Sequence, residues 1–165
     1  MDVREYRSAD LQACRLLWVQ LVEHHREIYS DPTIGGDDPG AGFDDYLALP
    51  DRVITWVAAE GDSIVGLAGL LWADEESTIE PVVVERRHRR TGVGRRLIET
   101  AIDESRRRGA KYVNIKPVAR NATAIQTFHE LGFRTLGHLQ LFMSLEHDDY
   151  DWIVGPQIHG RAFDC

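Results

Sequence analysis

The feature that most constrains the fold is a β-branched run that passes into a glycine-containing turn and then into an amphipathic helix. The run is residues 82–84 and the turn is residues 89–94. Apolar residues at helical spacing follow, namely Val93, Leu97, Ile98, Ala101 and Ile102. The turn therefore lies at a helix N-terminus, where glycines allow close approach and the backbone N–H groups and the helix dipole favour an anion.

The rest of the chain predicts alternating strands and helices. We expect strands at 2–6, 52–59, 63–72, 77–84, 111–117 and 139–145, and helices at 9–29, 93–108 and 121–131. This order predicts an α/β fold with a mixed sheet and helices on its faces. Residues 31–51 are rich in glycine and proline, which predicts a mobile loop with one helical turn near residues 43–47.

The turn differs from two better-known phosphate-binding loops. No lysine follows its second glycine, as a Walker A loop requires, and the three-glycine spacing of the dinucleotide fingerprint is absent. The pattern Arg89-x-x-Gly92-x-Gly94 instead resembles the coenzyme-A signature of the GNAT superfamily of N-acetyltransferases. Residues 79–84 precede it as that family's fourth strand does, and residues 121–133 resemble a second family signature.

The resemblance covers roughly residues 2–146 and implies the family's fold, in which strands four and five splay apart. It implies a central mixed sheet of about six to seven strands and one domain over residues 1–147. Residues 31–51 would form the acceptor-side loop, and residues 148–165 would be an extension whose packing the sequence leaves open.

The resemblance also implies how acetyl-coenzyme A (acetyl-CoA) would be bound. The backbone of Val82 and Val84 would contact pantetheine, and the amides from Arg90 to Arg95 would hold the pyrophosphate. Asn121 would contact the pantetheine arm. The residues implied to bind the coenzyme are Val82, Val83, Val84, Arg89, Arg90, Thr91, Gly92, Val93, Gly94, Arg95, Asn121, Ala124 and Phe128.

Acetyl transfer requires an uncharged amine, so a base has to remove a proton from an alkylammonium with a pKa of about 10. Glu80 occupies a position where many relatives carry an acidic residue, and it is our candidate for this base; a solvent-facing charge pair is the alternative. The N–H of Val82 or Val83 would stabilise the oxyanion. Pro81 cannot donate, and it indicates either a bulge or an edge strand.

Phe128 departs from the family pattern, because relatives usually carry at this position a tyrosine that protonates the leaving thiolate. Water or another side chain would then protonate the sulfur, or the thiolate leaves unaided. This departure keeps open a second hypothesis, a coenzyme-A-binding sensor or interaction module without catalysis.

Charge distribution bears on the possible partners. The net charge is −8, which argues against general binding to nucleic acids or anionic membranes. Arginines nevertheless cluster at positions 86, 87, 89, 90, 95, 96, 106, 107 and 108, so a nucleic-acid-binding protein is a third, remote hypothesis. Acidic residues at 37, 38, 44 and 45 indicate either a cationic acceptor or a solvated loop.

Three further expectations complete the prediction. Cys14 and Cys165 are expected to be free thiols of a cytoplasmic protein without a secretory signal or a membrane span. The histidines lack the spacing of a metal site, so no metal is expected. The sequence leaves monomer and homodimer open. The favoured function is transfer of an acetyl group from acetyl-CoA to a primary amine of a small molecule or peptide, by direct attack in a ternary complex.

Overall fold

The computed structural model describes residues 1–145 and 152–165, which form two compact units. The first unit is Met1–Lys116 and the second is Pro117–Cys165. The predicted boundary between residues 147 and 148 lies outside the described residues, as does the acidic stretch 146–151. The single domain over residues 1–147 therefore stays a prediction.

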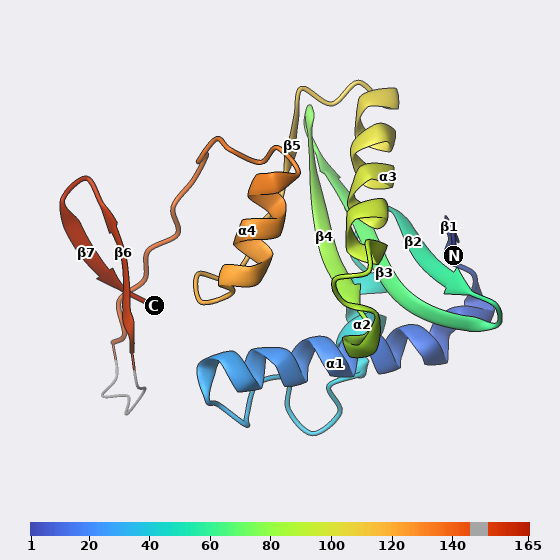
Figure 1. The fold of residues 1–165 in the computed structure, drawn as a ribbon, viewed down its shortest axis with the longest axis horizontal. Helices are drawn as coiled ribbons and strands as arrows, with labels where there is room; N and C mark the ends of the chain where they lie inside the picture. Colours follow the sequence, from blue (N-terminus) through green and yellow to red (C-terminus); the bar gives the residue numbers. More distant parts are fainter. Residues whose placement is uncertain (146–151) are drawn as a thin grey trace. The chain divides into compact units, whose positions relative to one another are not determined.

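A mixed sheet of five strands forms the centre of the first unit (Figure 1). The strands lie in the order β1-β2-β3-β4-β5, with antiparallel pairing from β1 to β4 and parallel pairing between β4 and β5. They are β1 (Asp2–Glu5), β2 (Arg52–Glu60), β3 (Ser63–Ala73), β4 (Glu76–Val84) and β5 (Tyr112–Asn114). The predicted α/β fold with a mixed sheet is confirmed, with five strands where about six to seven were expected.

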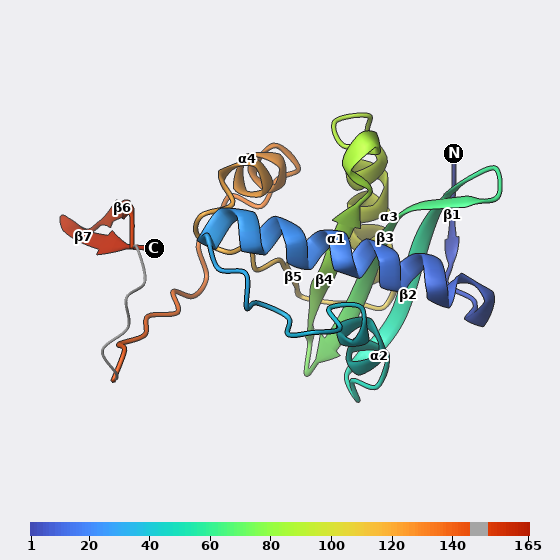
Figure 2. The same cartoon turned by 90° about the horizontal axis from the view of Figure 1, so that it is seen from below.

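Helices cover both faces of this sheet (Figures 1 and 2). They are α1 (Leu11–Tyr29), α2 (Ala41–Leu47) and α3 (Val93–Arg107), with short 3-10 turns at Ser8–Asp10 and Arg86–His88. The apolar stripe of α3 packs against β3 and β4, while α1 and α2 pack on the opposite face. Gly109, predicted to follow the last turn of α3, has a φ of 81°, which a glycine adopts without steric cost.

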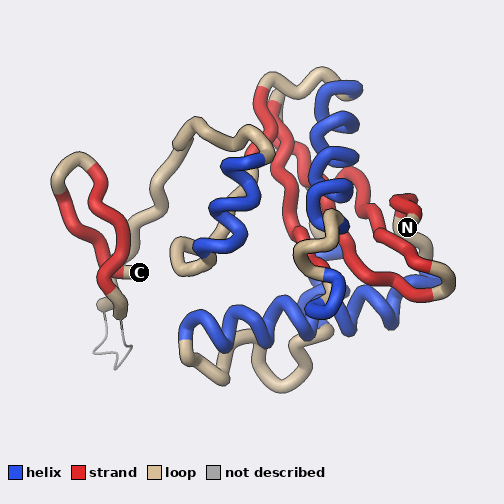
Figure 3. Tube along the Cα trace, in the orientation of Figure 1, coloured by secondary structure: helices blue, strands red, loops and turns tan. Residues whose placement is uncertain are grey.

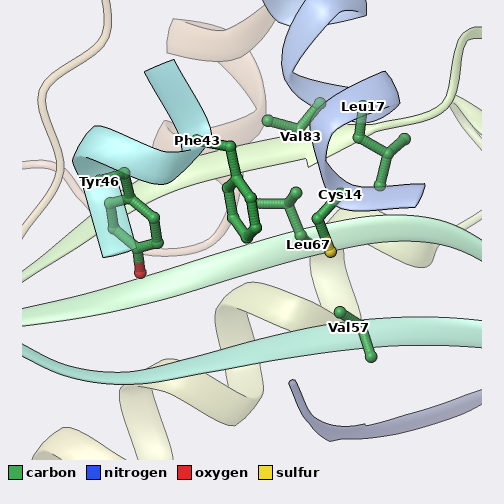
Figure 4. Packing of buried hydrophobic residues seen from close by; sticks show 7 residues of the cluster. All are labelled: Cys14, Leu17, Phe43, Tyr46, Val57, Leu67 and Val83. Atoms are coloured by element: carbon green, nitrogen blue, oxygen red, sulfur yellow. The ribbon is translucent and has the colours of Figure 1, made fainter. Parts of the chain in front are cut away.

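The core on the α1 and α2 face joins residues from both helices to β2, β3 and β4 (Figure 4). Its buried members are Cys14, Leu17, Phe43, Tyr46, Val57, Leu67 and Val83. Full burial of a large apolar side chain contributes roughly 1.5–3 kcal/mol. Phe43 is completely buried, so the second half of the segment predicted as a mobile loop is anchored in the core through α2.

Strand β4 carries a bulge at Glu80–Pro81, one of the two structures that Pro81 left open. Ala68 of β3 pairs with Val82, and Leu70 pairs with Ile79, so β4 has one more residue than β3 between these pairs. The extra residue bends the strand locally. The edge alternative also holds locally, because β5 pairs with Glu76–Thr78 and Pro81 lies beyond this ladder, although β4 as a whole lies between β3 and β5.

The pairing of β4 with β5 is short. Only Glu76–Thr78 pair with β5, through Tyr112–Asn114, whereas β4 continues to Val84. The ladder thus ends just before the bulge. This is the divergence expected between the fourth and fifth strands of the family fold.

The second unit contains α4 (Ala122–Glu130) and a separate antiparallel pair, β6 (Val154–Ile158) and β7 (Arg161–Asp164). Asn121 caps α4 as predicted, because its Oδ1 accepts a hydrogen bond from the Ala124 N–H at 3.1 Å. The prediction of a strand at residues 139–145 is wrong: these residues are loop (Figure 3). Their pattern suits a strand, but a strand also needs a hydrogen-bonded neighbour, which side-chain pattern does not specify.

Within residues 1–145 and 152–165, no helix combines the length and the apolar character needed to cross a lipid bilayer.

Candidate active site

The candidate site begins at the connection between β4 and α3. Gly92 is the N-cap residue of α3 with a φ of 92°, and no side chain caps the helix there. A Cβ built on Gly92 meets no atom within 4 Å, so the space beside the turn is open. The first N–H groups of a helix lack intrahelical partners and point along its axis. This end of α3 therefore has free N–H groups beside open space, and the anion cradle that the sequence predicts there stays a prediction.

Polar contacts on both sides hold this connection in place. His88 Nδ1 lies 2.6 Å from Glu85 Oε2, and its Nε2 lies 3.2 Å from Glu60 Oε2 at the end of β2. The Thr91 hydroxyl donates to the His88 carbonyl at 2.6 Å. Arg89 Nε donates to the carbonyl of Val84 at 3.2 Å.

Sequence reasoning missed Glu60, Glu85 and His88. Burial alone would raise the pKa of Glu85, but its contacts with Arg87 and His88 outweigh burial and hold this pKa below its usual value. Glu85 is therefore ionised near neutral pH, and its carboxylate lies against the His88 ring. The missing signal is spatial, because Glu60 is 28 residues from His88 in the chain.

We expect Gly92→Ala to lower the free energy of unfolding by about 1–2 kcal/mol, because an L-residue with Cβ is disfavoured at positive φ. Gly94→Ala is the matched control. The Cβ of an alanine at position 94 would lie 3.4 Å from Val84 Cγ2, which is an ordinary contact. Alanine also has a higher helix propensity than glycine. Urea unfolding of both variants measures the difference. Equal stability of the two variants contradicts the role assigned to the Gly92 backbone.

The arginine cluster separates into two groups. Arg106 pairs with Asp103 at 2.8 Å, and both Arg107 and Arg108 pair with Glu104. These contacts, led by the hydrogen bond from Arg107, lower the pKa of Glu104 to about 2. The last turn of α3 thus compensates much of its own positive charge. Arg89 and Arg90 precede α3, and Arg95 lies in its first turn, 3.7 Å from Glu99.

Strand β4 brings the remaining residues of the first unit next to this loop. Val83 is 3% exposed and packs in the core, so its side chain is not available for ligand contact, although its backbone can be. Val82 and Val84 are half-buried, and Glu80 is exposed at the bulge. The structure therefore places Glu80, Val82, Val83, Val84 and the loop residues 89–95 along one continuous stretch of β4 and its connection to α3.

The other predicted residues lie on α4 in the second unit. Asn121 and Ala124 form the cap described above, and Phe128 packs edge-on against Phe133, with ring centroids 6.3 Å apart. Their contribution to coenzyme binding stays a prediction.

The acidic residues of the acceptor-side loop are partly neutralised. Arg15 of α1 makes ion pairs with Asp38, at 2.7 Å, and with Asp44. Two of the four carboxylates on which the cationic-acceptor hypothesis depends are therefore already paired with a cation of the protein itself.

A family comparison matches residues 18–133 to the acetyltransferase (GNAT) family. The chain is 32% identical over 120 residues to streptothricin acetyltransferase of Streptomyces lavendulae, a match that covers 68% of this chain and 63% of that protein. It is 31% identical over 139 residues to L-methionine sulfoximine/L-methionine sulfone acetyltransferase of Salmonella typhimurium, covering 81% of this chain and 80% of the relative.

The fold is also similar to solved structures. The ribosomal-protein-S18-alanine N-acetyltransferase of Escherichia coli superposes with a TM-score of 0.65 at 20% identity, covering 82% of this chain and 79% of that one. The mixed sheet with its bulged β4, the uncapped glycine turn at α3 and the match over residues 18–133 all agree. The chain belongs to the acetyltransferase (GNAT) family.

Proposed function

We propose that the protein moves the acetyl group of acetyl-CoA to a primary amine by direct attack in a ternary complex. The observation that carries this proposal is the position of the uncapped α3 N-terminus directly after the bulged strand β4. The helix N-terminus suits a pyrophosphate. The bulged strand β4 extends beyond its ladder with β5, so its backbone groups there are available to a ligand. The two relatives above, named for acetylating an antibiotic and amino-acid analogues, support amine acetylation.

The residues of the first unit fit the coenzyme. The amides from Arg90 to Arg95 would hold the pyrophosphate at the open space beside Gly92, with Arg89 and Thr91 shaping the turn. The backbone of Val82 and Val84 would pair with pantetheine along the part of β4 that follows the β5 ladder. Asn121, Ala124 and Phe128 would contact the same arm from α4.

Glu80 would take the proton from the ammonium form of the acceptor. The amine nitrogen then bonds to the acetyl carbon, the C–S bond breaks, and the sulfur leaves with the electron pair. The N–H of Val82 or Val83 would stabilise the oxyanion. Since Phe128 has no hydroxyl, water or another side chain would protonate the leaving sulfur, or the thiolate leaves unaided.

Direct transfer is favoured over a covalent enzyme intermediate by the state of Cys14. This thiol is completely buried, and burial raises its pKa to about 12. A thiol in this state is not a nucleophile near neutral pH. We propose a primary amine as the acceptor. Cationic acceptors would depend on Asp37 and Asp45, the two carboxylates of the cluster that Arg15 does not pair with.

Calorimetric titration with acetyl-CoA tests the coenzyme site, and release of free coenzyme-A thiol tests turnover. We expect micromolar binding, and turnover with at least one amine of a panel containing an amino acid, a polyamine, an aminoglycoside and a peptide N-terminus. Binding without turnover on a broad panel supports the sensor hypothesis. A lack of binding up to millimolar acetyl-CoA contradicts both.

A further inference from the structure

Tyr46 is a buried polar side chain to which the proposed function gives no role. It lies on α2 and is 4% exposed, with its ring 5.8 Å from that of Phe43 and 5.7 Å from that of Trp18. Its hydroxyl lies 2.8 Å from the Thr55 hydroxyl of β2 (Figure 4 shows Tyr46 reaching toward the sheet). Burial raises the pKa of Tyr46 to about 12, so the phenol is neutral.

The same hydroxyl lies over the row of residues that crosses the sheet at the bulge. Thr55 of β2 is the register partner of Gly69 in β3, and Gly69 lies between the two β3 residues that flank the bulge of β4. A Cβ built on Gly69 would overlap the Tyr46 hydroxyl, and would lie 2.7 Å from Tyr46 Cζ and 2.5 Å from the carbonyl oxygen of Glu80. Tyr46, Gly69 and Glu80 therefore meet at one point.

These close contacts explain why residue 69 is a glycine. Its φ is not positive, so its backbone conformation does not require one. The absence of a side chain at Gly69 leaves room for both the Tyr46 hydroxyl and the Glu80 carbonyl. The phenol thus occupies the space directly against the backbone from which the Glu80 carboxylate projects.

We propose that Tyr46 is a positioning residue for Glu80. Its hydroxyl, fixed by the hydrogen bond with Thr55, holds the backbone of the β4 bulge against Gly69. The inference rests on the proposed function, in which Glu80 is the base. Because α2 belongs to the segment 31–51, this contact connects the acceptor-side loop with the proton-accepting group. Small displacements of a catalytic group lower rates strongly, whereas the coenzyme loop lies elsewhere and should be unaffected.

Tyr46→Phe tests the proposal, because it keeps the ring and removes only the hydroxyl. We expect kcat to fall roughly tenfold, with the KM for acetyl-CoA unchanged. Tyr6→Phe is the matched control, since the Tyr6 ring packs on Phe43 in the same core, 5.7 Å between centroids. Its kcat should equal that of the wild type. Thr55→Val, which removes the partner hydroxyl, should lower kcat as Tyr46→Phe does. Thr55→Ser, which keeps a hydroxyl, should retain most of the wild-type kcat.

A double-mutant cycle with Glu80→Gln separates positioning from a general loss of stability. If Tyr46 acts through Glu80, removing its hydroxyl costs little once the carboxylate is gone, so the two effects are not additive. Additive losses overturn the inference, as does an unchanged kcat in Tyr46→Phe. Leu17→Ala, which truncates an α1 residue of the same core, shows how much rate a destabilised fold loses by itself.

Amide hydrogen exchange tests the contact without turnover and thus independently of the proposed function. We expect exchange at Ala68 and Leu70, the β3 residues that flank the bulge, to be about tenfold faster in Tyr46→Phe than in Tyr6→Phe, because opening at the bulge becomes easier. Equal exchange in both variants overturns the inference. A wild-type protein that acetylates no amine contradicts the proposed function, and the exchange result still decides whether Tyr46 holds the bulge.

Discussion

Gly69→Ala is expected to lower the free energy of unfolding by about 3 kcal/mol or more, at the upper end of the cost of overpacking a core. The new methyl group would lie 2.7 Å from Tyr46 Cζ and 2.5 Å from the Glu80 carbonyl oxygen. Neither neighbour can move easily: Tyr46 is packed among aromatic rings, and Glu80 belongs to the backbone of a central strand. Urea unfolding followed by circular dichroism measures the loss.

Gly137→Ala serves as the control for this experiment, because a Cβ there meets no atom within 4 Å and the residue does not have a positive φ. We expect its stability to stay within about 0.5 kcal/mol of the wild type, as for most surface substitutions. A Gly69→Ala protein as stable as Gly137→Ala would show that Tyr46 does not lie against Gly69.

Glu80→Gln is expected to lower kcat roughly a hundredfold at neutral pH, which is the lower end of the usual contribution of a general base. The loss should shrink as the pH rises toward the pKa of the acceptor, about 10 for an alkylammonium, because the free amine then needs no base. The pH profile of kcat in wild type and variant, recorded between pH 6 and about 10, measures this change.

The matched control is Glu76→Gln, an exposed carboxylate in the same strand that accepts a hydrogen bond from Asn114 Nδ2 at 2.9 Å. A glutamine there can still accept that hydrogen bond, so we expect wild-type kcat at every pH. If Glu80→Gln and Glu76→Gln give the same profile, Glu80 is a solvent-facing strand residue, the alternative left open by the sequence.

The sequence predicts well those parts of the fold that depend on neighbouring residues. The hairpin of β2 and β3, the stripe of α3 and the Asn121 cap all follow from local pattern, and the structure confirms them. Pro81 indicated either a bulge or an edge position in β4, and the pairing of β4 with β3 was needed to show the bulge. The family assignment succeeded because the glycine turn is itself a local feature.

Other features depend on partners that are distant in the chain and could not be predicted. The strand expected at residues 139–145 does not form, because an alternating side-chain pattern does not specify a neighbouring strand with which to pair. The contacts of His88 with Glu60, and of Tyr46 with Thr55 and Gly69, join segments that share no sequence pattern. The burial of Phe43 was not predicted for a different reason, because the glycine and proline residues around it indicated a loop.

Gly69 is one of two glycines at which β3 is reduced to backbone thickness. A Cβ at Gly66 would lie 3.0 Å from Val93 of α3, and one at Gly69 would overlap Tyr46 of α2. Helices α3 and α2 thus pack closely against the two faces of β3 at positions where this strand carries no side chain. A larger residue at either glycine therefore requires a smaller one in the helix that faces it. Under the proposed function, changes made in β3 to alter acceptor preference would thus also affect the packing of the helix beside the coenzyme.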